Sequence, residues 1–358
     1  MIKYQKRRAG GISDRKLIRT EDAVGQVLCH DITQIIPGVV KDAVFRKGHI
    51  VTEEDIPVLL SVGKENLYIW EKQEGMLHEN EAAEILRQIC QGEHMHPSEV
   101  KEGKIELIAD CEGVLKINTE KLNAVNNLGE MMIASRHGNF PVKTGDKIAG
   151  TRIIPLVIEE EKMQKACEVA GKEPIFRILP YQKKKAGIVT TGSEVYYHRI
   201  EDKFTPVVIE KLKECGVTEV KQIQCNDDHE MIMEAIQTLI EDGSDLIVCT
   251  GGMSVDPDDR TPLAIKNACT EVVTYGAPVL PGAMFMLAYC EKEGRQIPVM
   301  GLPGCVMYAK RTIFDLALPR LLADDEITAE ELAALGEGGL CLNCSVCTYP
   351  NCGFGKGW

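Results

Sequence analysis

Short apolar runs alternate with amphipathic segments between residues 185 and 322. The run AGIVTTG, over 186–192, predicts a buried strand of the parallel-sheet type that ends at a glycine. A helix is expected over 206–215, followed by a strand over 218–223. Asp228 is suited to cap the next helix, whose apolar positions recur at helical spacing: Ile232, Ala235, Ile236, Leu239 and Ile240.

The run SDLIVCTGG, over 244–252, predicts a third buried strand, and the last helix of this stretch is expected over about 307–322. Strands and helices that alternate in this way are typical of an α/β domain with a doubly wound, mostly parallel sheet. The preceding residues are less regular. Besides strands, they predict a short helix over 52–62, a helix over 79–91 and several short strands over 103–158.

These patterns divide the chain into four expected parts. Residues 1–75 are predicted to form an N-terminal α+β segment, 76–184 a helix plus a β-rich domain, and 185–324 the α/β domain. Residues 325–358 are left as a linker and a short cysteine-rich tail. The linker holds glycines at 336, 338 and 339, and is therefore interpreted as a flexible connector.

Composition narrows the classes of function. The chain has 358 residues, and 54 acidic against 41 basic side chains give it a formal charge of −13. This balance argues against nucleic acid as a general partner, because neutralising phosphates needs a basic surface. The longest strongly apolar stretch, 277–290, contains proline and glycine and is too short to cross a bilayer, so no membrane partner is expected. The basic first residues precede no apolar run, so we expect no secretory signal and a cytoplasmic location.

Three segments place glycines, hydroxyls and carboxylates directly after predicted strands. They are 190–194 (TTGSE), 250–254 (TGGMS) with the acidic residues that follow it, and 301–304 (GLPG). Ligands bind at the carboxyl ends of the strands in an open parallel sheet, beside a topological switch point. Glycines let backbone N–H groups approach an anion, and carboxylates join such a site when Mg²⁺ bridges them to phosphate. Taken singly, such a segment is more often a tight turn or a solvated loop than a ligand-binding loop.

The same segments, in this order, resemble the molybdenum-cofactor biosynthesis domain. That domain is shared by molybdopterin adenylyltransferases, molybdopterin molybdenumtransferases and the competence-damage-inducible proteins, and the resemblance covers about 185–322. Asp227 matches the aspartate that precedes the family's second helix, and Asp259 in DDRT matches its aspartate shortly before a threonine. The resemblance implies a doubly wound α/β fold that binds molybdopterin or its adenylylated form.

Two further segments resemble the molybdenumtransferase branch. AVGQVLCHDI, over 23–32, is similar to that branch's opening segment, and 45–70 is similar to the segment that directly precedes its pterin domain. Here a long β-rich stretch intervenes, so the domain order is altered. The chain also departs from the branch where it carries Lys203-Phe204, Ala283-Met284 and Cys305.

By resemblance, the preferred activity is cleavage of adenylylated molybdopterin and insertion of molybdate, with Mg²⁺ and in a homo-oligomer. Two alternatives stay open: a non-catalytic molybdopterin-binding or redox-sensing accessory that docks a molybdoenzyme, and a hydrolase like the competence-damage group. The implied catalytic and Mg²⁺-positioning residues are Glu194, Asp227 and Asp259, with Asp256 and Asp258 as weaker candidates. The implied ligand-binding residues are Thr191, Gly192, Ser193, Gly251, Gly252, Ser254, Pro303 and Gly304.

The cysteine pattern at the C-terminus is a separate signal. Of 14 cysteines, most are scattered singly among apolar neighbours and are interpreted as small core residues. The others form a C-x2-C-x2-C-x4-C pattern whose tight spacing, with Pro350 in the last gap, favours a [4Fe–4S] cluster. A structural Zn²⁺ site is the rival interpretation, and an exposed tail of reactive thiols is the third. Lys356 is the nearby cation expected to favour thiolates, and the predicted metal ligands are Cys341, Cys344, Cys347 and Cys352.

Overall fold

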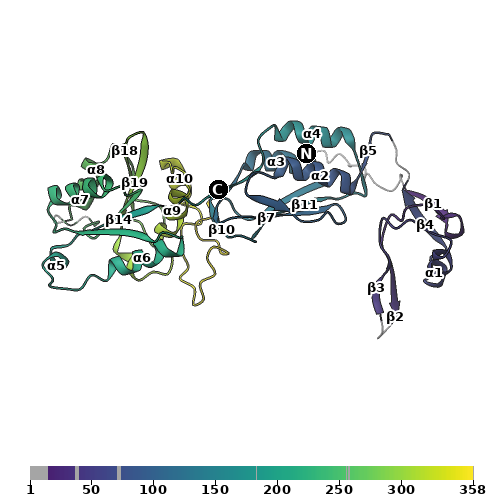
Figure 1. Cartoon of the computed structure of the whole chain (residues 1–358), viewed down its shortest axis with the longest axis horizontal. Coiled ribbons are helices and arrows are strands. Elements are labelled where there is room, and N and C mark those ends of the chain that lie inside the picture. The colour runs from purple at the N-terminus through teal and green to yellow at the C-terminus, as the bar shows by residue number, and fades with distance from the viewer. Residues whose placement is uncertain are drawn as a thin grey trace, which may run out of the picture.

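The computed structural model describes residues 15–36, 40–70, 74–182, 184–254, 256 and 259–357. An N-terminal part, a middle part and a C-terminal α/β domain follow one another along the long axis of the molecule (Figure 1). Separate hydrophobic clusters fill these parts: one in the first, one in the second, and two in the α/β domain. No helix within the described ranges is long and apolar enough to cross a membrane.

The N-terminal part is a small α+β unit. Leu28, Leu59 and Leu67 belong to its core. The predicted helix begins three residues later than expected, because Thr52 N–H and Oγ1 both donate to Asp55 Oδ2 at 2.8 Å and form a turn there. Its elements are β1 (Arg15–Arg19) paired with β4 (Asn66–Trp70), β2 (Ile32–Ile36) paired with β3 (Val40–Phe45), a 3₁₀ turn (Thr20–Asp22) and α1 (Asp55–Ser61).

The middle part is less purely β than the sequence predicted. Helices α3 (Thr119–Asn126) and α4 (Glu160–Ala170) were not expected, although the Asn118 side chain caps α3 by accepting from Lys121 N–H. The helix expected over 79–91 is confirmed as α2 (Glu79–Cys90). The strands are β5 (Met76–His78), β6 (Met95–Pro97), β7 (Lys104–Ala109), β8 (Gly113–Ile117), β9 (Met131–Ser135), β10 (Phe140–Val142), β11 (Lys147–Ile153), β12 (Val157–Glu159) and β13 (Phe176–Pro180).

The C-terminal domain contains the predicted doubly wound, mostly parallel sheet. Its six strands lie in the order β15-β14-β16-β19-β18-β17. The pairs β15–β14, β14–β16 and β16–β19 are parallel, whereas β18 runs antiparallel to both of its neighbours. The strands are β14 (Lys185–Thr190), β15 (Glu219–Gln224), β16 (Leu246–Thr250), β17 (Glu271–Tyr275), β18 (Met286–Lys292) and β19 (Arg295–Leu302).

Helices cover both faces of this sheet. Neighbouring residues of β14 point to opposite cores, because Ile188 packs with α6 and α9 while Val189 packs with α7 and α8. The apolar positions predicted from Ile232 to Ile240 are the buried stripe of α7, which Asp228 caps. The helices are α5 (Ser193–Tyr196), α6 (Phe204–Glu214), α7 (His229–Glu241), α8 (Thr261–Ala268), α9 (Ile313–Leu322) and α10 (Ala329–Ala334).

The prediction for the last helix of the sheet domain was wrong at its start. Residues Gly304–Met307 form a short 3₁₀ turn, η2, and α9 begins at Ile313. A capping box sets that boundary: Phe314 N–H donates to Thr312 Oγ1 at 3.2 Å, and Thr312 N–H donates to the Asp315 carboxylate at 2.8 Å. An apolar run alone cannot show where such a cap interrupts it.

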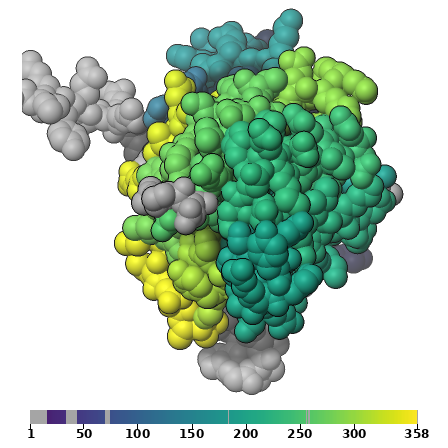
Figure 2. Space-filling model, turned by 90° about the vertical axis from the view of Figure 1, so that its left-hand side faces the viewer, coloured from purple at the N-terminus to yellow at the C-terminus, as the bar shows by residue number. Residues whose placement is uncertain are grey.

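The C-terminal tail, residues 325–357, packs onto the α/β domain, and the interpretation of its glycines as a flexible connector was wrong. A Cβ on Gly339 would lie 2.3 Å from the carbonyl oxygen of Pro278. Ile327, Leu332 and Phe354 are buried in the core that α6 and α9 share. Figure 2 shows the tail, in yellow, along one side of the domain. The glycines therefore allow the backbone of the tail to lie close to the backbone of the α/β domain.

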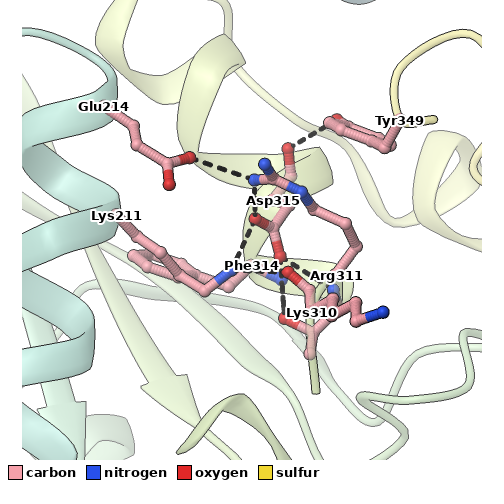
Figure 3. A network of polar contacts seen from close by, with 8 residues as sticks. Lys211, Glu214, Lys310, Arg311, Phe314, Asp315 and Tyr349 are labelled. Carbon is pink, nitrogen blue, oxygen red and sulfur yellow. Dashed lines mark hydrogen bonds and ion pairs between the residues drawn. The ribbon is translucent and has the colours of Figure 1, made fainter. Parts of the chain in front are cut away.

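A buried network of charges joins two helices to the tail (Figure 3). The buried carboxylate of Asp315, on α9, accepts hydrogen bonds from Lys211 Nζ at 2.7 Å and from Arg311 Nη1 at 2.8 Å. Arg311 Nη1 also donates to Glu214 Oε2 at 3.1 Å. Desolvation alone would lower the pKa of Arg311, but the hydrogen bonds and negative charges of Asp315 and Glu214 outweigh it and raise that pKa. Tyr349 Oη donates to the Asp315 backbone carbonyl at 2.9 Å. The network therefore holds α6, α9 and the tail together.

We predict that Asp315→Asn destabilises the α/β domain by about 3–5 kcal/mol, because it leaves the buried Lys211 and the half-buried Arg311 without their shared carboxylate. Urea unfolding of the full chain, followed by circular dichroism, measures the loss. Asp242→Asn is the matched control, since Asp242 pairs with Lys221 on the surface at 3.1 Å and its loss costs less than about 1 kcal/mol. Equal shifts for the two variants would contradict a central role for Asp315.

Candidate functional site

Three strands of the α/β domain end at the same level of the sheet. Thr190 at the end of β14 lies in register with Thr250 at the end of β16, and Thr250 with Leu302 at the end of β19. The chain leaves β14 toward β15 on one side and returns as β16 on the other, so a topological switch point lies between β14 and β16. The loops after these strands therefore emerge side by side at the edge where open α/β sheets bind ligands.

The three loops line one cleft of about 720 Å³, here called the strand-end cleft. Gly192, Ser193 and Asp227 are not among the described residues that line it. The sequence-predicted residues that do line it are Thr191, Glu194, Gly251, Gly252, Ser254, Asp259, Pro303 and Gly304. Asp256 is described but is not part of the lining, and Asp258 lies outside the described residues.

Glycines 251 and 252 are required by the backbone geometry of the middle loop. Both have positive φ, +86° and +56°, which side chains other than glycine rarely tolerate. A Cβ on Gly251 would lie 2.4 Å from the Thr191 carbonyl oxygen, and one on Gly252 would lie 2.7 Å from Thr261 Oγ1. Gly251 thus lets the loops after β14 and β16 touch through their backbones, and Gly252 lets the second loop approach the side chain of Thr261 at the start of α8.

Threonine hydroxyls form the floor of the cleft. Thr191 Oγ1 lies 3.1 Å from the Thr250 carbonyl oxygen and 3.1 Å from Thr261 Oγ1, so its bonds tie neighbouring loops together. Thr250 is fully buried, and its Oγ1 has no hydrogen-bond partner among the described residues. Buried hydroxyls nearly always have a partner, so this atom is suited to a ligand or a water in the cleft.

Asp259 and Asp227, the two aspartates that match the resembled family, each hold a loop in place. Asp259 Oδ2 accepts from Ser254 N–H at 2.8 Å, and Asp227 Oδ2 accepts from Ser193 N–H at 2.8 Å. In the described part of the chain, no three His, Cys, Asp or Glu side chains come together so as to hold a metal ion. Glu194, Asp227 and Asp259 therefore do not form a ready-made metal site.

The charge of the cleft is predominantly negative. Its described lining carries the carboxylates of Glu194, Glu201, Asp202 and Asp259 but a single cation, Lys203. An anionic ligand in this cleft needs either that lysine or a bridging divalent cation. Lys203 stands where the chain departs from the molybdenumtransferase pattern, and its place in the cleft was not predicted from the sequence, although it lies just before α6 after the first strand-end loop.

Tyr275, on β17, was also missed. Its hydroxyl donates to the Met253 carbonyl oxygen at 3.1 Å and so holds the loop that carries the two glycines. Burial, and then the nearby charge of Asp259, raise the pKa of Tyr275. The hydroxyl is therefore neutral at ordinary pH and remains a donor. Its position in sequence, on an edge strand far from every motif, offers no signal for this role.

The four tail cysteines lie around a second cavity, of about 370 Å³, here called the tail pocket. All four are free thiols. The singly scattered cysteines are different, since burial raises the pKa of Cys90 to about 12 and that of Cys225 to about 11. These two behave as the core residues that the sequence predicted, whereas the tail cysteines surround an open cavity.

Comparison with known families identifies the domain that carries the strand-end cleft. Residues 187–323 match the family described as "Probable molybdopterin binding domain". The α/β domain belongs to this family. Residues 17–71 match a second family, described as "Domain of unknown function (DUF8806)". The molybdopterin-binding family thus accounts for the α/β domain, and the N-terminal part carries a domain to which no function is attached.

Individual relatives of the molybdopterin-binding-family domain match over limited lengths. A "CinA-like protein" of Mycobacterium tuberculosis is 35% identical over 85 residues, which is 24% of this chain and 20% of the relative. One from Mycobacterium avium is 34% identical over 95 residues, covering 26% of this chain and 22% of the relative. The chain therefore spans about a fifth of the length of these curated relatives.

Solved structures similar to this chain include two from Pyrococcus furiosus. The "tungsten cofactor synthesizing protein MoaB" is 19% identical, with 40% of this chain and 89% of that chain covered and a TM-score of 0.30. A "Molybdenum cofactor biosynthesis protein" is 14% identical, with 87% of this chain and 65% of that chain covered and a TM-score of 0.25.

We predict that Gly251→Ala destabilises the molybdopterin-binding-family domain by more than Gly243→Ala does. Both glycines have φ of +86°, so both variants incur the cost of about 1–2 kcal/mol for a left-handed residue. Only Gly251 has an atom within 4 Å of the added Cβ, so its variant must also separate two loops. Urea midpoints of the two variants measure the difference, and equal midpoints would show that the close contact contributes nothing.

Proposed function

We propose that the α/β domain binds molybdopterin or its adenylylated form in the strand-end cleft. The observation that carries this proposal is the convergence of three strand-end loops on one cleft, within residues that match the molybdopterin-binding family. A cleft of about 720 Å³ falls in the usual size range for small-molecule sites. Molybdenum-cofactor biosynthesis is the process in which such a domain takes part.

The residues of the cleft suit a phosphorylated ligand that arrives with a divalent cation. Gly251, Gly252 and Gly304 line the cleft with little side chain, Thr250 Oγ1 is a hydroxyl with no partner among the described residues, and Lys203 is the cation of the described lining. Mg²⁺ prefers one or two carboxylates together with substrate phosphates and water. The carboxylates of Glu194 and Asp259 supply that number, so Mg²⁺ binding is expected to need the ligand's phosphate as well.

The finer proposal is a molybdenumtransferase-like reaction. Glu194 and Asp259 would hold Mg²⁺, which would neutralise charge while water hydrolyses the phosphoanhydride of adenylylated molybdopterin to AMP and molybdopterin, before molybdate is inserted. Asp227 acts in this proposal as a positioning residue, because it holds Ser193 N–H and thereby the loop that carries Glu194.

A second candidate function is a non-catalytic molybdopterin-binding accessory protein. Phe204, Met284 and Cys305 line the cleft at positions where this chain departs from the molybdenumtransferase pattern. These side chains leave the pterin-binding loops in place and change the surface on which a metal would be inserted. A homo-oligomeric state and a molybdoenzyme partner remain predictions that accompany either function.

We predict that Asp259→Asn weakens Mg²⁺-dependent binding of adenylylated molybdopterin about tenfold or more, equivalent to ~1.4 kcal/mol. The asparagine oxygen can still accept from Ser254 N–H, so the variant removes charge and keeps the loop. Equilibrium binding to the full chain, titrated with Mg²⁺ under anaerobic conditions, measures the effect. Asp242→Asn, on the surface pair with Lys221, is the control and should bind as the unmodified chain does. An unchanged Mg²⁺ dependence in Asp259→Asn would limit Asp259 to holding its loop.

Incubation of the chain with adenylylated molybdopterin, Mg²⁺ and molybdate distinguishes the candidate functions. Release of AMP supports the transferase, and tight binding without release supports the accessory protein. Hydrolysis of a nucleotide without any pterin would instead favour a hydrolase, the third possibility that resemblance to the competence-damage group implies. Failure to bind either form of molybdopterin would contradict the proposal as a whole.

A further inference from the structure

The tail pocket is a second site, with chemistry opposite to that of the strand-end cleft. Its described lining contains Cys341, Cys344, Cys347 and Cys352. Four cysteines within twelve positions of sequence line one cavity, so both the fold and the spacing bring them to it. Cysteines grouped in this way in sequence are metal ligands far more often than packing residues.

The cysteine segment is held at both ends and in its middle. Cys341 N–H donates to the Leu280 carbonyl oxygen at 2.8 Å, and Phe354 is buried in the core beyond the last cysteine. Between them, Lys310 Nζ donates to the carbonyl oxygens of Cys344 and Ser345, at 3.1 and 2.9 Å. The loop is thus shaped by its contacts with the α/β domain before any guest is bound.

The charge of the pocket suits an anionic guest. Lys310 and Arg311 are part of its described lining, and that lining includes no carboxylate. Arg311 is already paired with Asp315 and Glu214, so Lys310, whose Nζ donates to backbone carbonyl oxygens, offers the larger part of the free positive charge to a guest. The expectation that Lys356 is the cation beside the thiols was wrong. Its Nζ lies 5.6 Å from the centre of the Phe140 ring, and Lys356 is not part of the described pocket lining.

The spacing of the thiols favours a polynuclear guest over a single ion. A tetrahedral zinc site draws four sulfurs to about 2.3 Å from one ion, so the ligands crowd together. Within the described ranges no three potential ligands already lie close enough together to hold one metal ion, so a single ion would require the four cysteines that line this cavity to move together. An iron–sulfur cluster spreads its ligands, because each iron at its corners takes one thiolate. The cavity, about 370 Å³, is also more than ten times the ~30 Å³ of one water molecule.

We propose that the tail pocket binds a [4Fe–4S] cluster through Cys341, Cys344, Cys347 and Cys352. A cluster with four thiolate ligands carries net negative charge, which Lys310 and Arg311 complement. Leu340, Leu342 and Phe354 add apolar side chains to the lining, and of these Phe354 is buried. Tyr308 lines both the tail pocket and the strand-end cleft, so the cluster lies beside the proposed pterin site.

The full chain, purified anaerobically and reconstituted with ferrous iron and sulfide, tests this proposal. We expect about four iron and four acid-labile sulfide per chain, with broad visible absorption that dithionite bleaches and an electron paramagnetic resonance signal in the reduced state. Cys344→Ser and Cys347→Ser should each lose most of that iron and absorption. These two thiols are exposed, so their replacement should leave the fold intact, which circular dichroism checks.

Cys167→Ser is the matched control, because Cys167 is also an exposed free thiol but lies on α4, away from the tail pocket. It should retain the full iron content. One equivalent of zinc without iron would overturn the proposal in favour of a mononuclear site. Equal iron content in Cys344→Ser and Cys167→Ser would place any cluster elsewhere, and a chain that takes up neither metal would refute a metal site in the tail. None of these outcomes depends on pterin binding, so this test is independent of the proposed function.

Discussion

The common level at which β14, β16 and β19 end is the constraint on which the candidate site depends. Parallel pairing places Thr190, Thr250 and Leu302 in one row, so the residues that follow them leave the sheet side by side. No side-chain contact is needed to gather the loops, because the hydrogen bonds of the sheet do so. The close approach at Gly251 then joins two of the loops directly through their backbones. A cleft built in this way has a rigid floor, and its specificity depends on the few side chains that rise from the loops.

Buried charge organises the face of the domain that carries α6 and α9. Asp315 binds cations from α6 and from the start of α9, and its backbone carbonyl accepts from Tyr349 of the tail. The tail is therefore part of the tertiary structure of the domain, with Phe354 in its core. Lys310 and Arg311 both line the tail pocket, and Arg311 also belongs to the buried network, so one short segment contributes to both.

The two cavities differ in the ligands that their charges favour. The strand-end cleft has four carboxylates and one lysine in its described lining, whereas the tail pocket has two cations and four thiols. The first arrangement suits a phosphate that arrives with a divalent cation, and the second suits an anionic cluster bound by thiolates. Tyr308 borders both, so the chain places two dissimilar chemistries next to each other on one α/β scaffold.

Local pattern by itself determined β14, β15 and β16, the helices α6 and α7, and the residue types at the strand ends. Periodicity marked α7 and its cap Asp228, and glycines marked the ends of β14 and β16, because these features depend on neighbours within a few residues. Only the tertiary structure decided that Asp227 faces Ser193 and lies outside the cleft lining, and that Lys203 lies within it. It likewise decided that Gly339 lies in close contact with the backbone of Pro278, where composition had indicated a flexible connector. Such contacts join residues far apart in sequence, so they leave no trace in the spacing of hydrophobic and polar positions.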